Sequence, residues 1–212
     1  MDSSWLFNLG ADLYAWFTAQ SAWRSSCARM AALLGPLPRG CVLDLGCGPG
    51  VSTFELARLL PGVSLIGLDI APRMLAQARR RAGQCAVQWL LADAVRLPLR
   101  DASVDACTGH SFLYLVRDRA AVLAEARRVL KPGGRLVLME PHARGASPRA
   151  VLAVSRDPRH LVSVSLWRPF SRLHGRFTPC SLTATLGQAG FVDCRIEETL
   201  GGLGLLASAH RP

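Results

Sequence analysis

Apolar segments of strand length alternate along this chain with segments of helical length, and this alternation limits the folds open to it more than any other feature. Such alternation is typical of βαβ units, in which a helix connects two parallel strands. We expect the core strands at about residues 41–45, 64–69, 87–91, 104–108 and 135–140. The sequence therefore predicts an α/β fold built on a mostly parallel sheet.

Capping and turn residues separate the expected helices. The residues that favour a first helical turn are Ser52, Pro72, Asp118 and the pair Thr178–Pro179. We expect the four helices that they open to end near residues 60, 81, 130 and 190. A terminal pair of strands is expected at 191–198 and 203–209, with the turn at Gly201 and Gly202.

The 212 residues contain neither an internal repeat nor a low-complexity linker. Half of them are hydrophobic and 19% are charged, so the chain can bury a sizeable core. We therefore expect a single domain over residues 1–212. Its expected parts are an N-terminal helical cover (1–35), a central core (40–140), a basic segment (141–178) and a C-terminal helix with a strand pair (179–212).

Several classes of protein are disfavoured by what the sequence lacks. No uncharged apolar run reaches the roughly 18 residues that a membrane-spanning helix needs, and the aromatic N-terminus lacks the basic region of a signal peptide. The seven cysteines show no CxxC spacing, so neither disulfides nor a zinc site is indicated. Glu140 and His142 lie close together, but two residues do not make a metal site. We expect a cytoplasmic protein without a metal.

The most informative short segment is Asp-Leu-Gly-Cys-Gly-Pro-Gly at residues 44–50, directly after the first strand. Its glycines let the backbone turn sharply and let a ligand approach the main chain. A dinucleotide-binding loop uses glycines in this way, but its third small residue falls where Val51 stands. Asp44 would also repel a pyrophosphate, so a ligand with a cationic centre fits better. A nicotinamide-dependent oxidoreductase is therefore disfavoured.

Acidic residues come at the ends of three successive strands, at Asp44, Asp69 and Asp93. Because the carboxyl ends of parallel strands meet at one edge of a sheet, these side chains should converge on one crevice. Asp69 can accept both hydroxyls of a ribose there, and Asp93 can accept a hydrogen bond from an adenine amino group. The acids therefore indicate a nucleoside site.

Four segments of the chain resemble class I S-adenosylmethionine-dependent methyltransferases, in the small-molecule branch of ubiquinone and menaquinone methyltransferases known as type 11. The segments follow the family's order and spacing. They are residues 42–50 (VLDLGCGPG), 67–75 (GLDIAPRML), 91–94 (LADA) with Leu97-Pro98-Leu99 and Asp105, and 128–136 (RVLKPGGRL). The resemblance covers about residues 40–140. It implies a Rossmann-like, doubly wound sheet of seven strands with the last strand antiparallel, a helical N-terminal segment and a cap inserted after the fifth strand.

The resemblance implies S-adenosylmethionine as the cofactor, with S-adenosylhomocysteine as its product. The residues it places around this cofactor are Asp44, Gly46, Cys47, Gly48, Asp69, Ile70, Met74, Asp93, Ala94, His110 and Ser111. Asp69 would hold the ribose and Asp93 the adenine amine, with Ile70 and Met74 packed near the adenine. Each residue has a structural alternative: Asp44 could brace the turn, and Met74 could belong to the core.

The implied reaction is a direct in-line displacement, for which alignment of the reactants matters more than a covalent catalyst. A base is needed only where the methyl acceptor must lose a proton. The candidates are His110 after the fourth strand, His142 after the fifth strand and Tyr14 in the N-terminal segment. Any of the three could instead be a structural residue.

Two segments outside the core bear on the methyl acceptor. Six aromatic residues lie in the first 30 positions, where a helix over residues 5–22 would pack on the sheet, line an apolar pocket or lie on a bilayer. Residues 141–178 contain seven arginines and one acid, Asp157. These arginines are either solvated or attract an acidic group. We expect a small hydrophobic acceptor (a quinol, phenol, thiol or lipid-like molecule) with an acidic group, and a peripheral contact with an anionic membrane.

Two alternative functions come from other classes. The net charge of +10 would suit an RNA methyltransferase, but 24 of the 25 basic residues are arginine, which codon preference also explains. No RNA-binding module is appended, and Thr108-Gly109-His110-Ser111 stands where an amine-methylating Asn/Asp-Pro-Pro-Tyr/Phe motif would follow the fourth strand. The other alternative is a protein that binds S-adenosylmethionine without turnover, because binding motifs alone do not prove catalysis.

Overall fold

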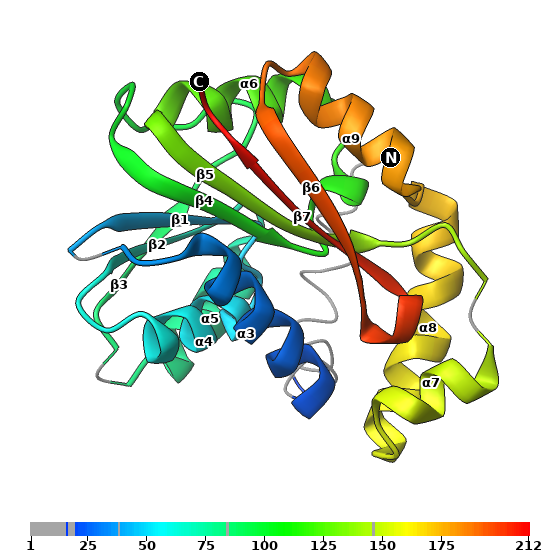
Figure 1. Cartoon of the computed structure of the whole chain (residues 1–212). Coiled ribbons are helices and arrows are strands. Elements are labelled where there is room, and N and C mark those ends of the chain that lie inside the picture. Colours follow the sequence, from blue (N-terminus) through cyan, green and yellow to red (C-terminus); the bar gives the residue numbers. More distant parts are fainter. Residues whose placement is uncertain (1–15, 17–19, 38, 84, 146) are drawn as a thin grey trace.

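A computed structural model describes residues 16, 20–37, 39–83, 85–145 and 147–212. Seven strands form one sheet in the order β3-β2-β1-β4-β5-β7-β6 (Figure 1). The strands are β1 (Cys41–Leu45), β2 (Ser64–Asp69), β3 (Val87–Leu91), β4 (Val104–His110), β5 (Leu130–Pro141), β6 (Val192–Thr199) and β7 (Gly204–His210). The first five strands pair in parallel, and β7 is antiparallel to both β5 and β6. The predicted seven-stranded sheet with an antiparallel last strand is confirmed.

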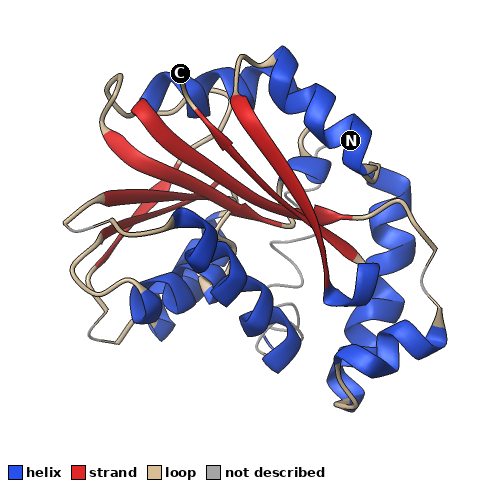
Figure 2. Cartoon of the chain, in the orientation of Figure 1, coloured by secondary structure: helices blue, strands red, loops and turns tan. Residues whose placement is uncertain are grey.

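Helices cover both faces of this sheet (Figure 2). Those on one face are α3 (Ser21–Leu34), α4 (Val51–Leu59) and α5 (Pro72–Arg81), and those on the other are α6 (Arg119–Val129) and α9 (Pro179–Gln188). Two further helices, α7 (Pro148–Val154) and α8 (Pro158–His174), lie beyond the end of the sheet near the turn between β6 and β7. Short 3₁₀ helices follow β4 and β6, at η1 (Leu113–Leu115) and η2 (Leu200–Gly202). No helix among the described residues has the length and apolar character needed to cross a bilayer.

Each face of the sheet packs into its own hydrophobic cluster. Leu43 of β1 packs on one face with residues of α6 and α9, whereas its neighbour Val42 packs on the other face with Met30 of α3 and Leu56 of α4. Successive strand residues point to opposite faces, so a strand covered on both sides must be apolar at nearly every position. This double coverage explains why the central strands appear in the sequence as short continuous apolar runs.

Several boundaries agree with the sequence-based predictions. The observed β1, β2, β3 and α5 have the predicted limits. Asp118 caps α6 by accepting a hydrogen bond from the Ala121 amide at 2.9 Å. Thr178 and Ser181 form a reciprocal capping box at the start of α9, where Pro179 is the first helical residue. Local capping chemistry therefore positioned these helices correctly.

Three local predictions were wrong. Helix α4 begins at Val51, and Gly50 is its N-cap in a left-handed conformation, because the Ser52 hydroxyl is used by Asp44 instead of the helix. Strand β4 continues to His110, so this residue ends the strand instead of following it. Strand β5 begins at Leu130, because Leu130 pairs with Val104 before a register shift places Arg135 opposite Ala106.

The basic segment forms α7 and α8, and two of its arginines bond to main-chain carbonyls. The Arg168 guanidinium is buried and donates to the main-chain carbonyls of His142 (2.8 Å) and Arg144. Arg176 donates to the carbonyl of Arg168. Arg168 thus ties α8 to the segment that follows β5, and its guanidinium is already used by these carbonyls. The helix predicted over residues 5–22 lies mostly outside the described residues.

Candidate active site

The glycine loop follows β1 at the centre of the sheet, where the strand order reverses between β1 and β4. Gly46, Gly48 and Gly50 all have positive φ angles, of 62°, 53° and 85°. A Cβ atom added at Gly46 would lie 2.2 Å from Cδ2 of Phe112. Glycine is therefore required at residue 46 by conformation and by the close approach of the loop after β4.

Asp44 is fully buried beneath this loop. Its Oδ2 accepts hydrogen bonds from the Ser52 and Thr53 hydroxyls, both at 2.7 Å, and its Oδ1 accepts one from Thr108 at 2.9 Å. Burial raises the pKa of the carboxyl, while the three hydroxyls act in the opposite direction. Asp44 thus braces the loop by joining β1, α4 and β4. Its predicted direct contact with a ligand stays a prediction.

Asp69 at the end of β2 is tied to the same loop. Its Oδ2 accepts the Gly48 amide and its Oδ1 accepts the Ala71 amide, each at 2.8 Å. The side chain is only half-buried, and each oxygen keeps a further lone pair for a ligand hydroxyl. Burial raises the pKa of this carboxyl, and the amide hydrogen bonds lower it.

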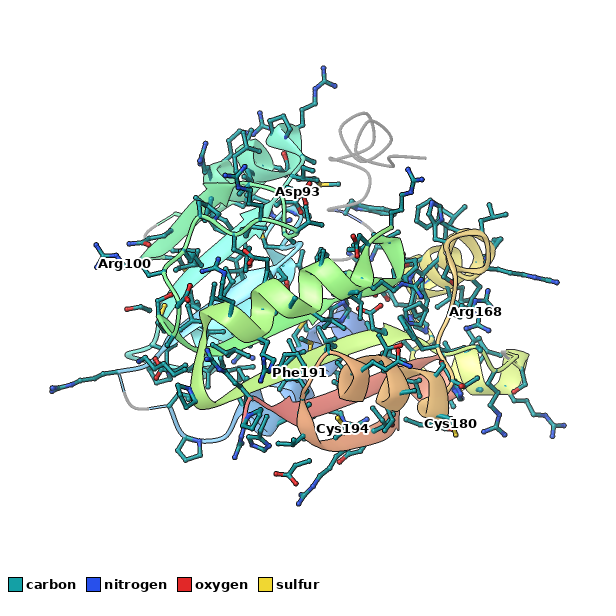
Figure 3. All side chains as sticks on the ribbon, turned by 90° about the horizontal axis from the view of Figure 1, so that it is seen from above. Asp93, Arg100, Arg168, Cys180, Phe191 and Cys194 are labelled. Carbon is teal, nitrogen blue, oxygen red and sulfur yellow. The ribbon has the colours of Figure 1, made fainter. Side chains whose placement is uncertain are left out.

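The other predicted cofactor residues divide into exposed and buried groups. Asp93, labelled in Figure 3, lies exposed just after β3, and its Oδ1 accepts the Val95 amide at 3.1 Å. Ile70 is 48% exposed, which places an apolar side chain in solvent beside Asp69. Cys47, Met74 and Ala94 are buried, and burial raises the pKa of the Cys47 thiol, so this sulfur is a poor nucleophile.

His110 and Ser111 lie at the end of β4, under α3. The Nε2 of His110 is 2.6 Å from the Ser26 hydroxyl, and the imidazole packs against Trp23 with ring centroids 4.3 Å apart. Burial lowers the pKa of His110 to about 3. Its Nδ1 and the Ser111 hydroxyl are buried without a hydrogen-bond partner in the part of the chain that the structure describes. Ser111 also has a positive φ of 54°, a strained conformation that is common at functional sites.

Glu140 near the end of β5 was not predicted as a site residue. It is fully buried, and its carboxylate accepts the amides of Phe112 (3.2 Å), Leu113 (2.7 Å) and Tyr114 (3.0 Å). Burial raises its pKa to about 7. It therefore holds the loop after β4 against the glycine loop. An acid at the end of a fifth apolar strand, as at Asp44 and Asp69, was the signal that could have found it.

The other two candidate bases are His142 and Tyr14. The Nδ1 of His142 is 3.1 Å from the Gly202 carbonyl in the turn between β6 and β7, and its backbone bridges to Phe177. Tyr14 lies outside the described residues. Within the described ranges, no group of three or more His, Cys, Asp or Glu residues could hold a metal ion.

Comparison with known proteins matches residues 43–138 to a family model described as a methyltransferase domain. A demethylmenaquinone methyltransferase from Mycolicibacterium paratuberculosis is 33% identical over 225 residues, covering 98% of this chain and 86% of the relative. One from Deinococcus radiodurans is 43% identical over 120 residues, covering 56% of this chain and 48% of the relative. Other curated relatives are likewise matched over only part of their length, from 35% to 63%.

Solved structures show the same fold. A chain of the Haloferax volcanii complex formed with the Trm112 methyltransferase activator superposes with a TM-score of 0.74 at 21% identity, covering 97% of both chains. An S-adenosylmethionine-dependent methyltransferase from Aquifex aeolicus superposes with a TM-score of 0.69 at 18% identity, covering 88% of this chain and 89% of the other. At these identities the likeness concerns the fold alone.

Proposed function

Because the chain belongs to the class I S-adenosylmethionine-dependent methyltransferases, we propose that it methylates a small apolar or aromatic acceptor, with a quinol or phenol as the first candidate. The observation that carries the proposal is the pairing of Asp69 with the Gly48 amide, which joins the glycine loop to the acid at the end of β2. The relatives named as demethylmenaquinone methyltransferases support a ring-containing acceptor.

The residues around the loop fit S-adenosylmethionine. The half-buried carboxylate of Asp69 has a lone pair left on each oxygen for the two ribose hydroxyls. The exposed side chain of Ile70 offers an apolar surface to the adenine ring, and Asp93 offers an acceptor for its amino group. The carboxylates of this edge favour a cationic ligand over a polyphosphate. When bound, S-adenosylmethionine supplies a methyl group on a positively charged sulfur for direct displacement.

The chain's own residues would act by orienting the acceptor and excluding water. Positioning of this kind can lower a barrier by about 7–11 kcal/mol without a covalent catalyst. Trp23 packs between His110 and Trp167, with ring centroids 4.3 and 6.3 Å away, and so joins α3 and α8 beside the end of β4. Both helices lie outside the matched residues 43–138. We infer that α3 and α8 select the acceptor, and that their aromatic side chains favour an apolar ring.

Calorimetric titration with S-adenosylmethionine and S-adenosylhomocysteine tests the proposal. We expect the wild type to bind both with micromolar affinity and Asp69→Asn to bind at least about 10-fold more weakly, because one oxygen of the Gly48–Ala71 clasp becomes an amide nitrogen. Asp101→Asn is the matched control, since Asp101 is 77% exposed and pairs only with Arg128 among the interactions described. Failure of folded wild type to bind either ligand would overturn the proposal.

Turnover separates an enzyme from a protein that only binds the cofactor. With binding established, quinols, phenols, thiols and lipid head groups are offered in turn, and formation of S-adenosylhomocysteine is measured. Transfer to a phenol or quinol, with none to transfer RNA, is the expected result. Transfer to RNA that falls steeply with salt would favour the nucleic-acid alternative instead.

A further inference from the structure

Helix α8 buries several polar side chains and leaves a row of apolar side chains in solvent. Its buried residues include His160, Ser163, Arg168 and Ser171, together with Val164. Val162, Leu166 and Leu173 are in contrast 46%, 55% and 83% exposed. An amphipathic surface helix usually keeps such an apolar row against the core.

The exposed apolar residues lie on one side of α8. Residues 162, 166 and 173 are spaced by four and seven positions, and an α-helix brings such positions onto one face. Pro169, which is also exposed, falls within the same stripe. Helix α7 contacts α8 and adds Leu152, which is 48% exposed. A continuous apolar stripe on a surface helix marks an interaction site more reliably than single exposed residues do.

The same two helices and the segment between them are strongly basic. Arg149, Arg156 and Arg172 are exposed. The acid of this segment, Asp157, is already held by Arg159 in a 2.8 Å ion pair. Trp16, 53% exposed, lies near the start of α8 with its ring 5.9 Å from the Arg159 guanidinium. A positive surface with exposed aliphatic and aromatic side chains matches the boundary between lipid head groups and acyl chains.

We propose that these two helices dock on the surface of an anionic lipid bilayer through a cap surface made of Leu152, Val162, Leu166 and Leu173 with Arg149, Arg156 and Arg172. The apolar stripe enters the acyl-chain boundary, and the arginines bind lipid phosphates. The cap lies at the edge of the molecule beyond the sheet, and Figure 3 shows Arg168 of α8 on the side opposite Arg100. The cap can therefore meet a flat surface without displacing the core.

Other occupants fit the cap surface less well. A second copy of the chain would bring arginines of one cap against those of the other, and like charges at an interface are unfavourable. Four aliphatic side chains also provide much less than the roughly 800 Å² per partner of a stable protein interface. Nucleic acid would use the arginines but not the apolar stripe.

Vesicle flotation of the full chain tests the proposal in the absence of any methyl acceptor. We expect binding to vesicles of phosphatidylcholine with phosphatidylglycerol at least about 10-fold above binding to phosphatidylcholine alone, and a decrease as salt rises. The double variant with Leu166→Gln and Leu173→Gln should bind these vesicles about 10-fold more weakly than the wild type. Val192→Gln is the matched apolar control, since Val192 is 42% exposed on β6 at the sheet edge.

Two double variants that remove the same number of charges distinguish the local charge of the cap surface from the net charge of the chain. Arg156→Gln combined with Arg172→Gln should weaken binding, whereas Arg81→Gln combined with Arg100→Gln, also exposed, should leave it nearly unchanged. Titration with S-adenosylhomocysteine checks that each variant is folded and keeps cofactor binding separate from membrane binding. Equal losses in both arginine pairs, equal binding to both kinds of vesicle, or a dimer in light scattering that Leu166→Gln dissociates would overturn the proposal.

Discussion

Among the residues that the structure describes, Glu140 and Asp44 are the two fully buried carboxylates of the site region, and each binds to a different loop. Asp44 holds the start of α4 through the hydroxyls of Ser52 and Thr53, and Glu140 holds three successive amides after β4. A buried acid is costly unless its lone pairs are used, and here they are. At the scale of single residues, these two acids determine where the backbone around the ligand lies.

Glu140 should make stability depend on pH. Burial raises its pKa from 4.5 to about 7, so the folded protein keeps a proton that the unfolded chain releases. The corresponding stability is complete below pH 4.5 and is lost as the pH rises through about 7. We expect the stability of the wild type relative to Glu140→Gln to fall by roughly 1–3 kcal/mol between pH 5 and pH 8. Urea unfolding of both proteins at pH 5 and pH 8 measures this change. A difference in stability between them that does not depend on pH would contradict the prediction.

Ser26 should determine the tautomer of His110. The Ser26 hydroxyl has one proton and donates it to the Trp23 carbonyl at 2.7 Å, so its 2.6 Å contact with Nε2 requires that His110 donates from Nε2. Nδ1 then carries the lone pair. The ¹⁵N chemical shifts of the ring at pH 7 should show this tautomer in the wild type and in Ser26→Thr, and a weaker preference in Ser26→Ala. An Nδ1–H tautomer in the wild type would refute the assignment.

The glycine loop is the element on which the cofactor site depends, and its conformation is set from both sides. Asp69 holds the loop from β2 through the Gly48 amide, and Phe112 packs against Gly46 from the loop after β4. Phe112 is in turn held by Glu140. The loop is thus positioned by elements that lie on both sides of β1 in the sheet.

Gly46→Ala should damage the site more than a similar change elsewhere. Both Gly46 and Gly62 have positive φ, so alanine at either costs about 1–2 kcal/mol of backbone strain. The added Cβ meets Phe112 at residue 46, but nothing within 4 Å at residue 62. We expect Gly62→Ala to bind S-adenosylhomocysteine like the wild type and Gly46→Ala to lose about 10-fold or more in calorimetry. Equal affinities of the two variants would contradict the prediction and show that Phe112 can move aside without weakening ligand binding.

In the whole molecule, a methyltransferase core and the two-helix cap of α7 and α8 are joined by side-chain contacts from several elements. Arg168 is central to this connection because its buried guanidinium bonds the carbonyls of His142 and Arg144. Arg119 of α6 adds a bond to the His174 carbonyl at 3.3 Å, and its guanidinium lies 4.7 Å from the Phe177 ring centroid. Arginine in this segment therefore serves attachment as well as surface charge.

Removal of the Arg168 guanidinium should loosen the cap. Arg168→Leu leaves two carbonyls unpaired, so we expect a loss of about 2–3 kcal/mol in unfolding free energy and faster amide exchange in α8. Arg172→Leu, at an exposed position of the same helix, should change neither the unfolding free energy nor the amide exchange of α8. Urea unfolding and hydrogen exchange followed by mass spectrometry make the comparison. Similar exchange in the two variants would mean that the cap is attached by other contacts.

Local information in the sequence determined the strand order along the chain, the limits of β1, β2, β3 and α5, the caps at Asp118 and Thr178, and the acids at the strand ends. Periodicity and capping depend on residues within a few positions of one another, so one sequence is enough to read them. Only the tertiary structure decided that Thr108 donates to Asp44, that Glu140 binds the loop after β4, and that α8 leaves an apolar stripe exposed. These features depend on contacts between residues 64 and 27 positions apart, and on which face of a helix the rest of the molecule covers. The local sequence pattern specifies neither these long-range contacts nor which face of the helix is covered.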